Sequence, residues 1–386
     1  MDASKTTEQH ILRWLEGQCD NMLELLELLV NIDGGSLDKA GVDEVGDRLS
    51  EFFAAHAVRT ETIPDSRYGD ALRCSLGGDK AKPVLLLGHR DTVFPKGEAA
   101  RRPFRIENGR AYGPGVADMK AGLVMNAFVF AAFSKFSPKT PLVCLCTGDE
   151  EIGSPYSRAI IEQEGRRARA VFNAEPGRTN GAVITGRKGG VFMRFDVAGK
   201  AAHSGANFEQ GIRAIEEIAR KIIALHALTD FDKGVTVNVG TVAGGQSVNT
   251  VAPHARAEID LRFITPLDRD AAMQKIESIV KTSHVPGTRA TLEIESEFLP
   301  FVETQAGLRL YRHYAACAKE VGLTAPSEFT GGCADSGFTA NVGTPTLCAT
   351  GPIGARAHSP DEFVDVLSIV PRAQALALAI ARIDQA

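Results

Sequence analysis

The sequence has little net charge and no long apolar run, and these absences exclude several classes of protein. Its 386 residues carry 43 Lys and Arg against 48 Asp and Glu, a net charge of -5. Nucleic acids and anionic membranes attract basic faces, so neither is expected as the main partner. No apolar run approaches the roughly 20 residues that span a bilayer. The N-terminus has no basic segment followed by an apolar one, as a signal peptide has, so we expect a cytoplasmic protein.

Three familiar catalytic or structural patterns are also missing. The seven cysteines form no Cys-x-x-Cys pair, which is typical of reduced, buried thiols. Cys333 lies in a Gly-rich stretch and could line a site, but no His or Lys pattern marks it as a nucleophile. No Gly-x-Ser-x-Gly elbow indicates a serine hydrolase. The stretch GPGVAD (113–118) lacks the third glycine of a dinucleotide-binding turn, so a dehydrogenase is set aside.

The length favours two domains, and the first part of the chain alternates helical and strand patterns. Apolar runs bounded by Pro, Gly or polar residues predict buried strands at 83–89, 141–147 and 170–175. Helical spacing is present at 8–30, 40–56 and 117–133. This alternation predicts an α/β fold with a mostly parallel sheet flanked by helices.

The pattern changes near residue 188. Strand and helix signals then follow in the order β-α-β-β-α-β, which is the ferredoxin-like order. After residue 298 the first pattern resumes, with a helix at 306–321, a strand at 345–350 and a closing helix at 366–383. We therefore predict a catalytic domain from residues 1–187 and 299–386, with an inserted α+β domain at 188–298.

Acidic and imidazole side chains follow the predicted strands of the large domain. In open α/β sheets the ligand site lies outside the carboxyl ends of the strands, so these residues are expected at one rim. Two His and several carboxylates suit a pair of zinc ions. Each signal is weak alone, because such residues often form solvated turns or helix N-caps. The residues concerned are His89, Asp91, Asp118, Asp149, Glu150, Glu151, Glu175 and His358.

Seven motifs in order along the chain carry a family resemblance. They are GHRDTVFP (88–95), YGPGVADMKAG (112–122), TGDEEIGS (147–154), NAEPG (173–177), GKAAHSG (199–205), GGCADSGF (331–338) and AHSPDEFV (357–364). The chain resembles the M20 metallopeptidases, and within them the glutamate carboxypeptidase (carboxypeptidase G) type. Relatives include acetylornithine deacetylase, succinyl-diaminopimelate desuccinylase and aminoacylase. The resemblance implies a zinc-exopeptidase fold whose inserted domain serves as lid and dimerisation domain.

The resemblance implies a role for each residue of the rim. Glu150 would be the general base, Asp91 would orient an imidazole of the site, and a cis peptide would follow Asp118. Two zinc ions per chain are implied, and the same ligands accept cobalt or manganese. His89 and Glu175 would bind one ion, Glu151 and His358 the other, and Asp118 would bridge the two.

The inserted domain would recognise the substrate. His203 matches a family residue that reaches the partner's site in a homodimer and stabilises charge on the carbonyl oxygen. Arg262 and Asn249 match residues that hold the substrate carboxylate, and Lys188 could assist. The alternative from the pattern alone is that His203 ends a strand in an exposed turn and that Arg262 is a surface residue of a strand.

The expected function is hydrolysis of the amide bond of a small-molecule N-acyl amino acid or peptide with a free carboxylate, releasing glutamate. The alternative is a deacylase acting on acetylornithine or succinyl-diaminopimelate. A non-catalytic binding homologue is disfavoured because the ligand set is intact.

Overall fold

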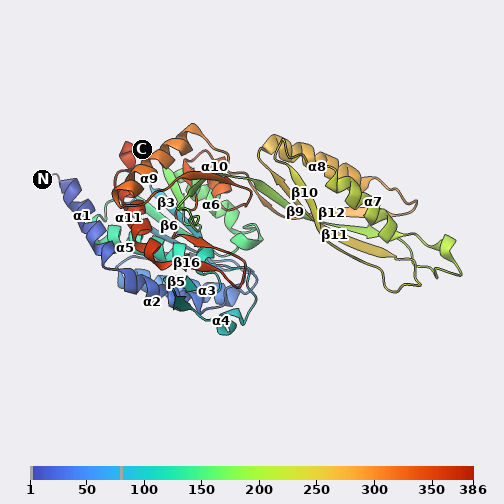
Figure 1. Ribbon diagram of the computed structural model, residues 1–386, viewed down its shortest axis with the longest axis horizontal. Coiled ribbons are helices and arrows are strands. Elements are labelled where there is room, and N and C mark those ends of the chain that lie inside the picture. The colour runs from blue at the N-terminus through green and yellow to red at the C-terminus, as the bar shows by residue number, and fades with distance from the viewer. Residues whose placement is uncertain (1–2, 79–80) are drawn as a thin grey trace. The chain divides into compact units, whose positions relative to one another are not determined.

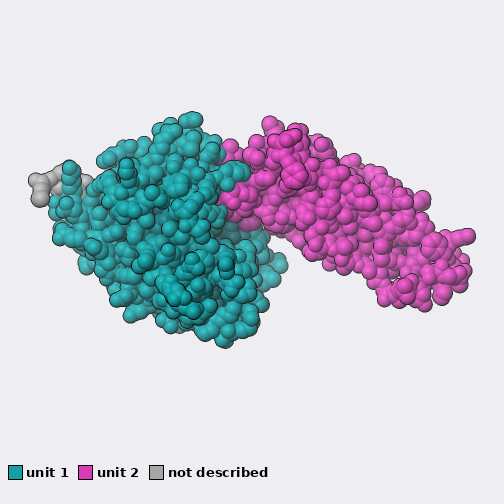
Figure 2. All heavy atoms as spheres, in the orientation of Figure 1, with its two compact units in different colours: residues 1–186, 303–329, 334–386 teal, residues 187–302, 330–333 magenta. Residues whose placement is uncertain are grey.

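The computed structural model describes residues 3–78 and 81–386, and the chain divides into two compact units. The first unit comprises residues 1–186, 303–329 and 334–386, and the second comprises 187–302 and 330–333 (Figure 2). The segment predicted as an insertion, 188–298, lies within the second unit. Residues 330–333 also group with the second unit, although the sequence pattern assigned them to the catalytic domain.

A six-stranded sheet forms the centre of the first unit (Figure 1). Its parallel strands β3 (Val84–His89), β6 (Leu142–Thr147) and β7 (Ala170–Asn173) are buried along their whole length and mostly apolar, as expected where both faces of a sheet are covered. The two strands at one edge run antiparallel, so the predicted α/β fold with a mostly parallel sheet is confirmed. In spatial order the strands are β1 (Thr60–Ile63), β2 (Ala71–Leu76), β6 (Leu142–Thr147), β3 (Val84–His89), β7 (Ala170–Asn173) and β14 (Thr346–Leu347).

The strand predicted at 345–350 is shorter than its apolar run. Only Thr346 and Leu347 pair with β7. The next residue, Cys348, exchanges backbone hydrogen bonds of 2.8 and 3.0 Å with Ile184 instead. Ile184 belongs to β8 (Val183–Arg187), which pairs with β13 (Ser327–Thr330). The chain therefore leaves the main sheet before the apolar run ends.

Helices and a second sheet complete the first unit. The stretch predicted as one helix at 8–30 is two helices that break at Gly17 and Gln18, because glycine strongly disfavours a helix interior. A four-stranded antiparallel sheet has the order β15 (Gly354–Ala355), β16 (Phe363–Asp365), β5 (Arg110–Tyr112), β4 (Arg105–Glu107). The helices are α1 (Ala3–Glu16), α2 (Cys19–Val30), α3 (Lys39–Ala55), α4 (Glu98–Arg101), α5 (Ala121–Phe136), α6 (Ser157–Arg167), α9 (Gln305–Glu320), α10 (Ser336–Asn341) and α11 (Val366–Ala381), with single turns at Glu150–Ile152 and Ile383–Gln385.

Helix α5 and the turn before it correct two expectations. Val116–Phe136 spans 21 residues with a mean hydropathy of 1.5, long and apolar enough to cross a membrane, which the sequence analysis denied. However, 94% of the 18-residue window with this hydropathy is buried inside the structure, as in the core helix of a soluble protein. The helix begins at Ala121 and not at 117, because Val116–Lys120 form a wide turn in which Asp118 has non-helical dihedral angles.

The second unit has its own sheet and core. Its strands are β9 (Gly189–Ala198), β10 (Thr236–Gly244), β11 (His254–Phe263) and β12 (Arg289–Phe298), paired antiparallel in the order β10-β11-β9-β12. Helices α7 (Ala214–His226) and α8 (Pro266–Lys281) pack on it, and a single turn lies at Phe208–Gln210. This is the predicted ferredoxin-like order. Alternate residues of β9, from Val191 to Val197, are buried in the core.

Candidate metal centre and active site

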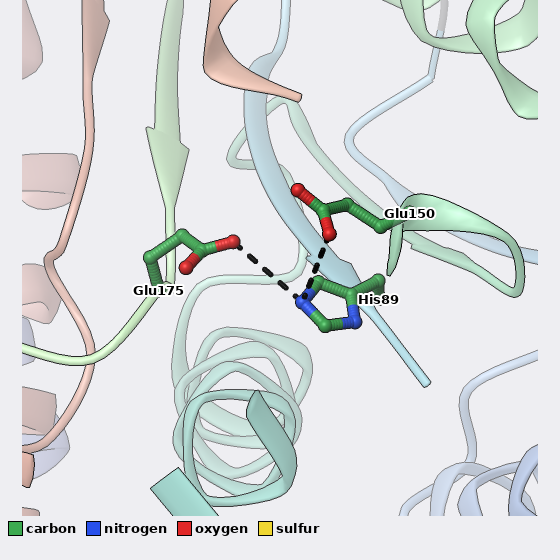
Figure 3. Close-up of side chains that lie close together, drawn as sticks. All are labelled: His89, Glu150 and Glu175. Carbon is green, nitrogen blue, oxygen red and sulfur yellow. Dashed lines mark ion pairs between the residues drawn. The ribbon is translucent and has the colours of Figure 1, made fainter. Parts of the chain in front are cut away.

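Three parallel strands deliver the central side chains of the site. His89 is the last residue of β3, Glu150 follows the end of β6, and Glu175 follows the end of β7. Because β3 pairs in parallel with both neighbours, the three strand ends meet at one edge of the sheet. Figure 3 shows both glutamates pointing toward the imidazole of His89. The prediction of a common rim for these residues matches the geometry.

His89 lies at the centre of two overlapping groups of ligand-type atoms. Its Nε2 is 3.2 Å from Asp118 Oδ1, 3.6 Å from Glu175 Oε1 and 3.9 Å from Glu150 Oε2. In one group His89 is joined by Glu150 and Glu175, and in the other by Asp118 and Glu151. Within each group the ligand atoms lie within 4.8 Å of one another. The imidazole is buried.

Asp118 faces two different histidines with its two oxygens. Oδ1 is near His89, while Oδ2 lies 3.3 Å from Nε2 of His358. The same Nε2 is 3.1 Å from Glu151 Oε2. A carboxylate with one oxygen directed to each of two ligand groups has the arrangement of a bridging ligand. The peptide bond from Asp118 to Met119 is cis, as the resemblance implies.

Burial and like charges perturb the acids of this cluster. Burial raises the pKa of Glu151 to about 7, and burial together with Glu175 and Asp335 raises that of Glu150. Hydrogen bonds to Asp118 and Glu151 raise the pKa of His358 to about 10. Several carboxylates and two imidazoles thus lie close together in a largely buried cluster.

Asp91 organises the loop that carries Glu150 and Glu151. Its carboxylate accepts the backbone N–H groups of these two residues, each at 3.1 Å, and the hydroxyl of Ser36 at 2.7 Å. Nδ1 of His89 lies 3.0 Å from the backbone oxygen of Asp91 and 3.4 Å from its carboxylate. Asp91 therefore contacts the imidazole mainly through its backbone, and its side chain positions the two glutamates.

Arg262 is the best-defined candidate for substrate recognition in the second unit. Its Nε and Nη2 donate to the two oxygens of Asp260 at 2.7 and 3.1 Å. Nη1 lies 2.7 Å from the sulfur of Cys333, and the guanidinium stacks over Phe192. The neighbouring strand offers Gly190 beside it, where an added Cβ would be 2.8 Å from the sulfur of Cys333. Asp260 and Cys333 thus hold the guanidinium in a fixed orientation.

The other predicted site residues of the second unit are His203, Asn249 and Lys188. Exposed His203 accepts the N–H groups of Gly205 and Ala206 at Nδ1, each at 3.1 Å. Asn249 is exposed, and its backbone oxygen accepts the N–H of the residue after His203. Lys188 is half-buried and packs near Gly234. The structure brings the segments of His203 and Asn249 together, and within the described residues no hydrogen bond or ion pair joins either side chain to Arg262 or Lys188.

Comparison with known proteins identifies the family. The profile of peptidase family M20/M25/M40 matches residues 85–382. The chain belongs to this family. It is similar to carboxypeptidase G2 of Pseudomonas sp. (strain RS-16), with 29% identity over 91% of this chain and 86% of that protein. Succinyl-diaminopimelate desuccinylase of Delftia acidovorans is 28% identical over 90% of this chain and 94% of that protein.

Solved structures agree on the fold. An M20 family metallo-carboxypeptidase from Sulfolobus solfataricus superposes with a TM-score of 0.77 at 18% identity, covering 93% of this chain and 98% of that chain. Aminopeptidase PepT from Bacillus cereus gives 0.75 at 22% identity, covering 95% and 99%. This M20 protein is therefore an enzyme of the metallopeptidase and amidohydrolase class, with the zinc-exopeptidase fold.

The residues of the rim fit the metal dependence of M20 enzymes, which typically use zinc. Imidazole nitrogens and carboxylate oxygens are the donors that zinc accepts. Within the described part of the chain, Glu151 Oε1 is buried and has no hydrogen-bond partner. A buried carboxylate oxygen without a donor is costly unless a cation compensates it. The candidate ligands and this oxygen therefore suit a bound cation.

Three buried acids support the site; the sequence analysis named Asp149 at the rim but missed Glu362 and Asp335. Glu362 accepts N–H groups of the turn that carries Asp118, Asp335 accepts the hydroxyl of Ser154, and Asp149 accepts the N–H groups of two residues after the 150–152 turn. All three are fully or almost fully buried. Glu362 and Asp335 lie within motifs already noted, AHSPDEFV and GGCADSGF. Their positions in these motifs were the signal that could have identified Glu362 and Asp335.

Proposed function

We propose that this M20 enzyme binds two divalent ions and hydrolyses the amide bond of an N-acyl amino acid or peptide with a free carboxylate, releasing glutamate. The observation that carries the proposal is Asp118, whose two oxygens face His89 and His358. We assign Glu175, 3.6 Å from His89 Nε2, to the ion on the His89 side, and Glu151, 3.1 Å from His358 Nε2, to the ion on the His358 side. Zinc is the expected metal, and cobalt or manganese suits the same donors.

The metal pair, when bound, polarises the scissile carbonyl and lowers the pKa of water. Glu150 Oε2 lies 3.9 Å from Nε2 of His89, farther than the oxygens of Asp118 and Glu175, and we assign it to proton transfer. Its carboxylate takes a proton from the attacking water and delivers it to the leaving nitrogen. The carbon–nitrogen bond breaks, and a carboxylic acid and a free amine result. The carboxylate of Asp91 holds Glu150 in place by accepting the backbone N–H of Glu150.

Arg262 is the proposed anchor for the carboxylate of the released amino acid. Asp260 and Cys333 orient its guanidinium, and a guanidinium held in one orientation suits a carboxylate. Asn249 and Lys188 are proposed as secondary contacts to the same carboxylate. Similarity to carboxypeptidase G2 supports glutamate as the first amino acid to test.

His203 is proposed to stabilise the charge that develops on the carbonyl oxygen, in the site of the partner in a homodimer formed through the second unit. Nδ1 accepts two backbone N–H groups, so the ring proton of the neutral form belongs on Nε2. An exposed Nε2–H is a donor held in a fixed direction, which is what an oxyanion requires.

The test is amino-acid release from a panel of amides by the zinc-loaded enzyme. The panel contains folate-type and benzoyl glutamates, acetylornithine, succinyl-diaminopimelate and neutral N-acetyl amino acids. We expect glutamate to dominate, and Glu150→Gln to lower kcat by about 10²–10⁴-fold without loss of metal. Release of a basic or neutral amino acid instead would leave the metal chemistry standing and make the enzyme a deacylase. A near wild-type rate for Glu150→Gln would refute its role as base.

A further inference from the structure

The short segment 330–333 brings a cysteine to the second unit. It groups with that unit although the chain on either side of it belongs to the first unit. Lys188 donates its backbone N–H to the oxygen of Thr330 at 3.0 Å, and Nη1 of Arg187 donates to the backbone oxygen of Cys333 at 3.1 Å. Two hydrogen bonds from the residues before β9 therefore hold both ends of the segment, and Cys333 lies at its C-terminal end.

Cys333 is one of three side chains that hold the guanidinium of Arg262. Asp260 accepts from Nε and Nη2 at 2.7 and 3.1 Å, and the ring centroid of Phe192 lies 4.9 Å from Cζ. Sγ of Cys333 lies 2.7 Å from Nη1. In the part of the chain that the structure describes, Cys333 is the only hydrogen-bond acceptor of Nη1. The thiol therefore completes the set of contacts that fixes the guanidinium.

The neighbouring strand β9 leaves room for the sulfur. Gly190 of β9 pairs with Arg262 of β11 across the sheet. An added Cβ on Gly190 would lie 2.8 Å from Sγ of Cys333 and 3.3 Å from Nη1 of Arg262. A side chain at this position would therefore displace the thiol, the guanidinium or both, and glycine inside a strand often marks such a close approach. The contact between Cys333 and Arg262 depends on this missing side chain.

The chemistry of the thiol suits an acceptor that must not compete with an anionic ligand. Burial raises the pKa of the Cys333 thiol, and the nearby guanidinium of Arg262 opposes the rise only in part, so the sulfur is uncharged near neutral pH. Asp260 already offsets part of the charge of Arg262. A second carboxylate beside Nη1 would offset more of it and would compete with a bound carboxylate for the same donors. A neutral sulfur orients Nη1 without adding negative charge.

We propose that Cys333 is a positioning residue, which holds Arg262 for the substrate carboxylate by accepting a hydrogen bond from Nη1. The inference rests on the proposed function, in which Arg262 anchors that carboxylate. Cys333 acts on the binding of substrate and not on the bond-breaking step, so its loss raises KM and leaves kcat nearly unchanged. Because sulfur is a weak acceptor, the expected rise in KM is about 3–10-fold, at the low end for a hydrogen bond to a charged group.

The first experiment is steady-state kinetics of two substitutions at Cys333 with the preferred amide of the panel. Cys333→Ala removes the acceptor and should show the 3–10-fold rise in KM, whereas Cys333→Ser keeps an acceptor and should stay within about twofold of wild type. Cys19→Ser is the matched control, because Cys19 is also a partly exposed cysteine but lies in α2 of the first unit. It should leave KM unchanged. A wild-type KM for Cys333→Ala, a loss in kcat in place of KM, or a serine variant as impaired as alanine overturns the proposal.

A double-mutant cycle tests the contact itself. Gly190→Ala should raise KM in the wild-type background, because the new Cβ displaces the sulfur. In the Cys333→Ala background the sulfur is absent, so the double variant should have a KM below the product of the two single effects. Effects that simply multiply contradict a shared contact between position 190 and Cys333.

NMR of arginine-labelled protein separates this inference from the proposed function. The Nε–H and Nη–H signals of Arg262, assigned by their loss in Arg262→Lys, report how firmly the guanidinium is held, with or without turnover. We expect Cys333→Ala to speed rotation of the guanidinium. If it does so while Cys333→Ala and Arg262→Lys both keep the wild-type KM, the anchoring role in the proposed function fails and the contact stands. If Arg262→Lys raises KM but Cys333→Ala alters neither KM nor these signals, the anchoring role stands and the inference is overturned.

Discussion

The replacement Glu362→Gln tests how the fold holds the candidate bridging ligand. Glu362 is fully buried and accepts three backbone N–H groups of the turn that carries Asp118. Oε1 accepts those of Ala117 and Asp118 at 2.8 and 3.0 Å, and Oε2 accepts that of Gly115 at 3.2 Å. Glutamine keeps one carbonyl oxygen and so can satisfy two of the three. Its NH₂ group then faces the N–H of Gly115, which loses its acceptor.

The magnitude follows from these contacts. One buried donor without an acceptor costs about 1–3 kcal/mol, and the two remaining bonds weaken because the acceptor is neutral. Burial raises the pKa of Glu362 to about 7, so its charge is only partial near neutrality in the metal-free protein. We therefore expect a loss of about 2 kcal/mol in stability. Displacement of Asp118 should also weaken metal binding by about 10–100-fold, as is typical for groups that orient ligands.

Two assays separate the two effects. Denaturant unfolding of the metal-free protein measures stability, and competition with a chromophoric chelator measures metal affinity. Glu217→Gln is the matched control: Glu217 lies in the second unit, is fully buried, and accepts the N–H groups of His284 and Val285 at 2.9 and 2.6 Å. It should lower stability and leave metal affinity unchanged. If Glu362→Gln loses stability yet binds metal like wild type, the reasoning that Glu362 acts through Asp118 is refuted.

Three further predictions address recognition, metal and stability. Arg262→Lys should raise KM for the preferred substrate about 10–100-fold with a smaller change in kcat, since lysine loses the bidentate contact and the bond to Asp260; steady-state kinetics measure this, and an unchanged KM contradicts the assignment. Removal of metal by a chelator should abolish turnover and lower Tm, and added zinc should restore both; activity that survives verified metal loss contradicts a metal-dependent reaction. Lys221→Met should destabilise the protein by about 3–5 kcal/mol in denaturant unfolding, because it leaves the buried carboxylate of Glu217, 2.7 Å away, without its cation. Burial opposes ionisation of Glu217, but Lys221 and backbone N–H groups lower its pKa overall. The stabilisation by this ion pair is therefore present above the unfolded pKa of Glu217 and is lost as the pH falls through its folded pKa. A Lys221→Met variant as stable as wild type at pH 7 contradicts the account.

The sequence by itself determined the fold class and the chemistry of the rim. Buried strands such as 84–89 and 142–147 are largely apolar runs; His89 is the last residue of the first, and Glu150 follows the second. Strand ends in a parallel sheet meet at one edge whatever the details of the chain path, so the convergence could be predicted. The order of elements in the second unit followed from alternation and helical spacing in the same way.

The ends of helices and strands were less predictable, because the local sequence pattern does not show which distant residues compete for the backbone hydrogen bonds. The run at 345–350 reads as one strand, but Cys348 pairs with Ile184, which is distant in sequence. The apolar stretch from Val116 reads as one helix, but the turn around Asp118 is held open by Glu362, 244 residues away. Such hydrogen bonds depend on the path of the chain in three dimensions.

Only the tertiary structure decided how the candidate ligands relate to one another and what surrounds them. That one oxygen of Asp118 faces His89 and the other faces His358 depends on three separate segments meeting at defined angles. The loops of Gly35 and Phe94 approach so closely that an added Cβ on Gly35 would lie 2.6 Å from the backbone oxygen of Phe94, and no periodicity in either loop expresses this approach. Local sequence specifies residue types and element periods, whereas distances between segments are set by packing and long-range hydrogen bonds, and the reactivity of this site depends on those distances.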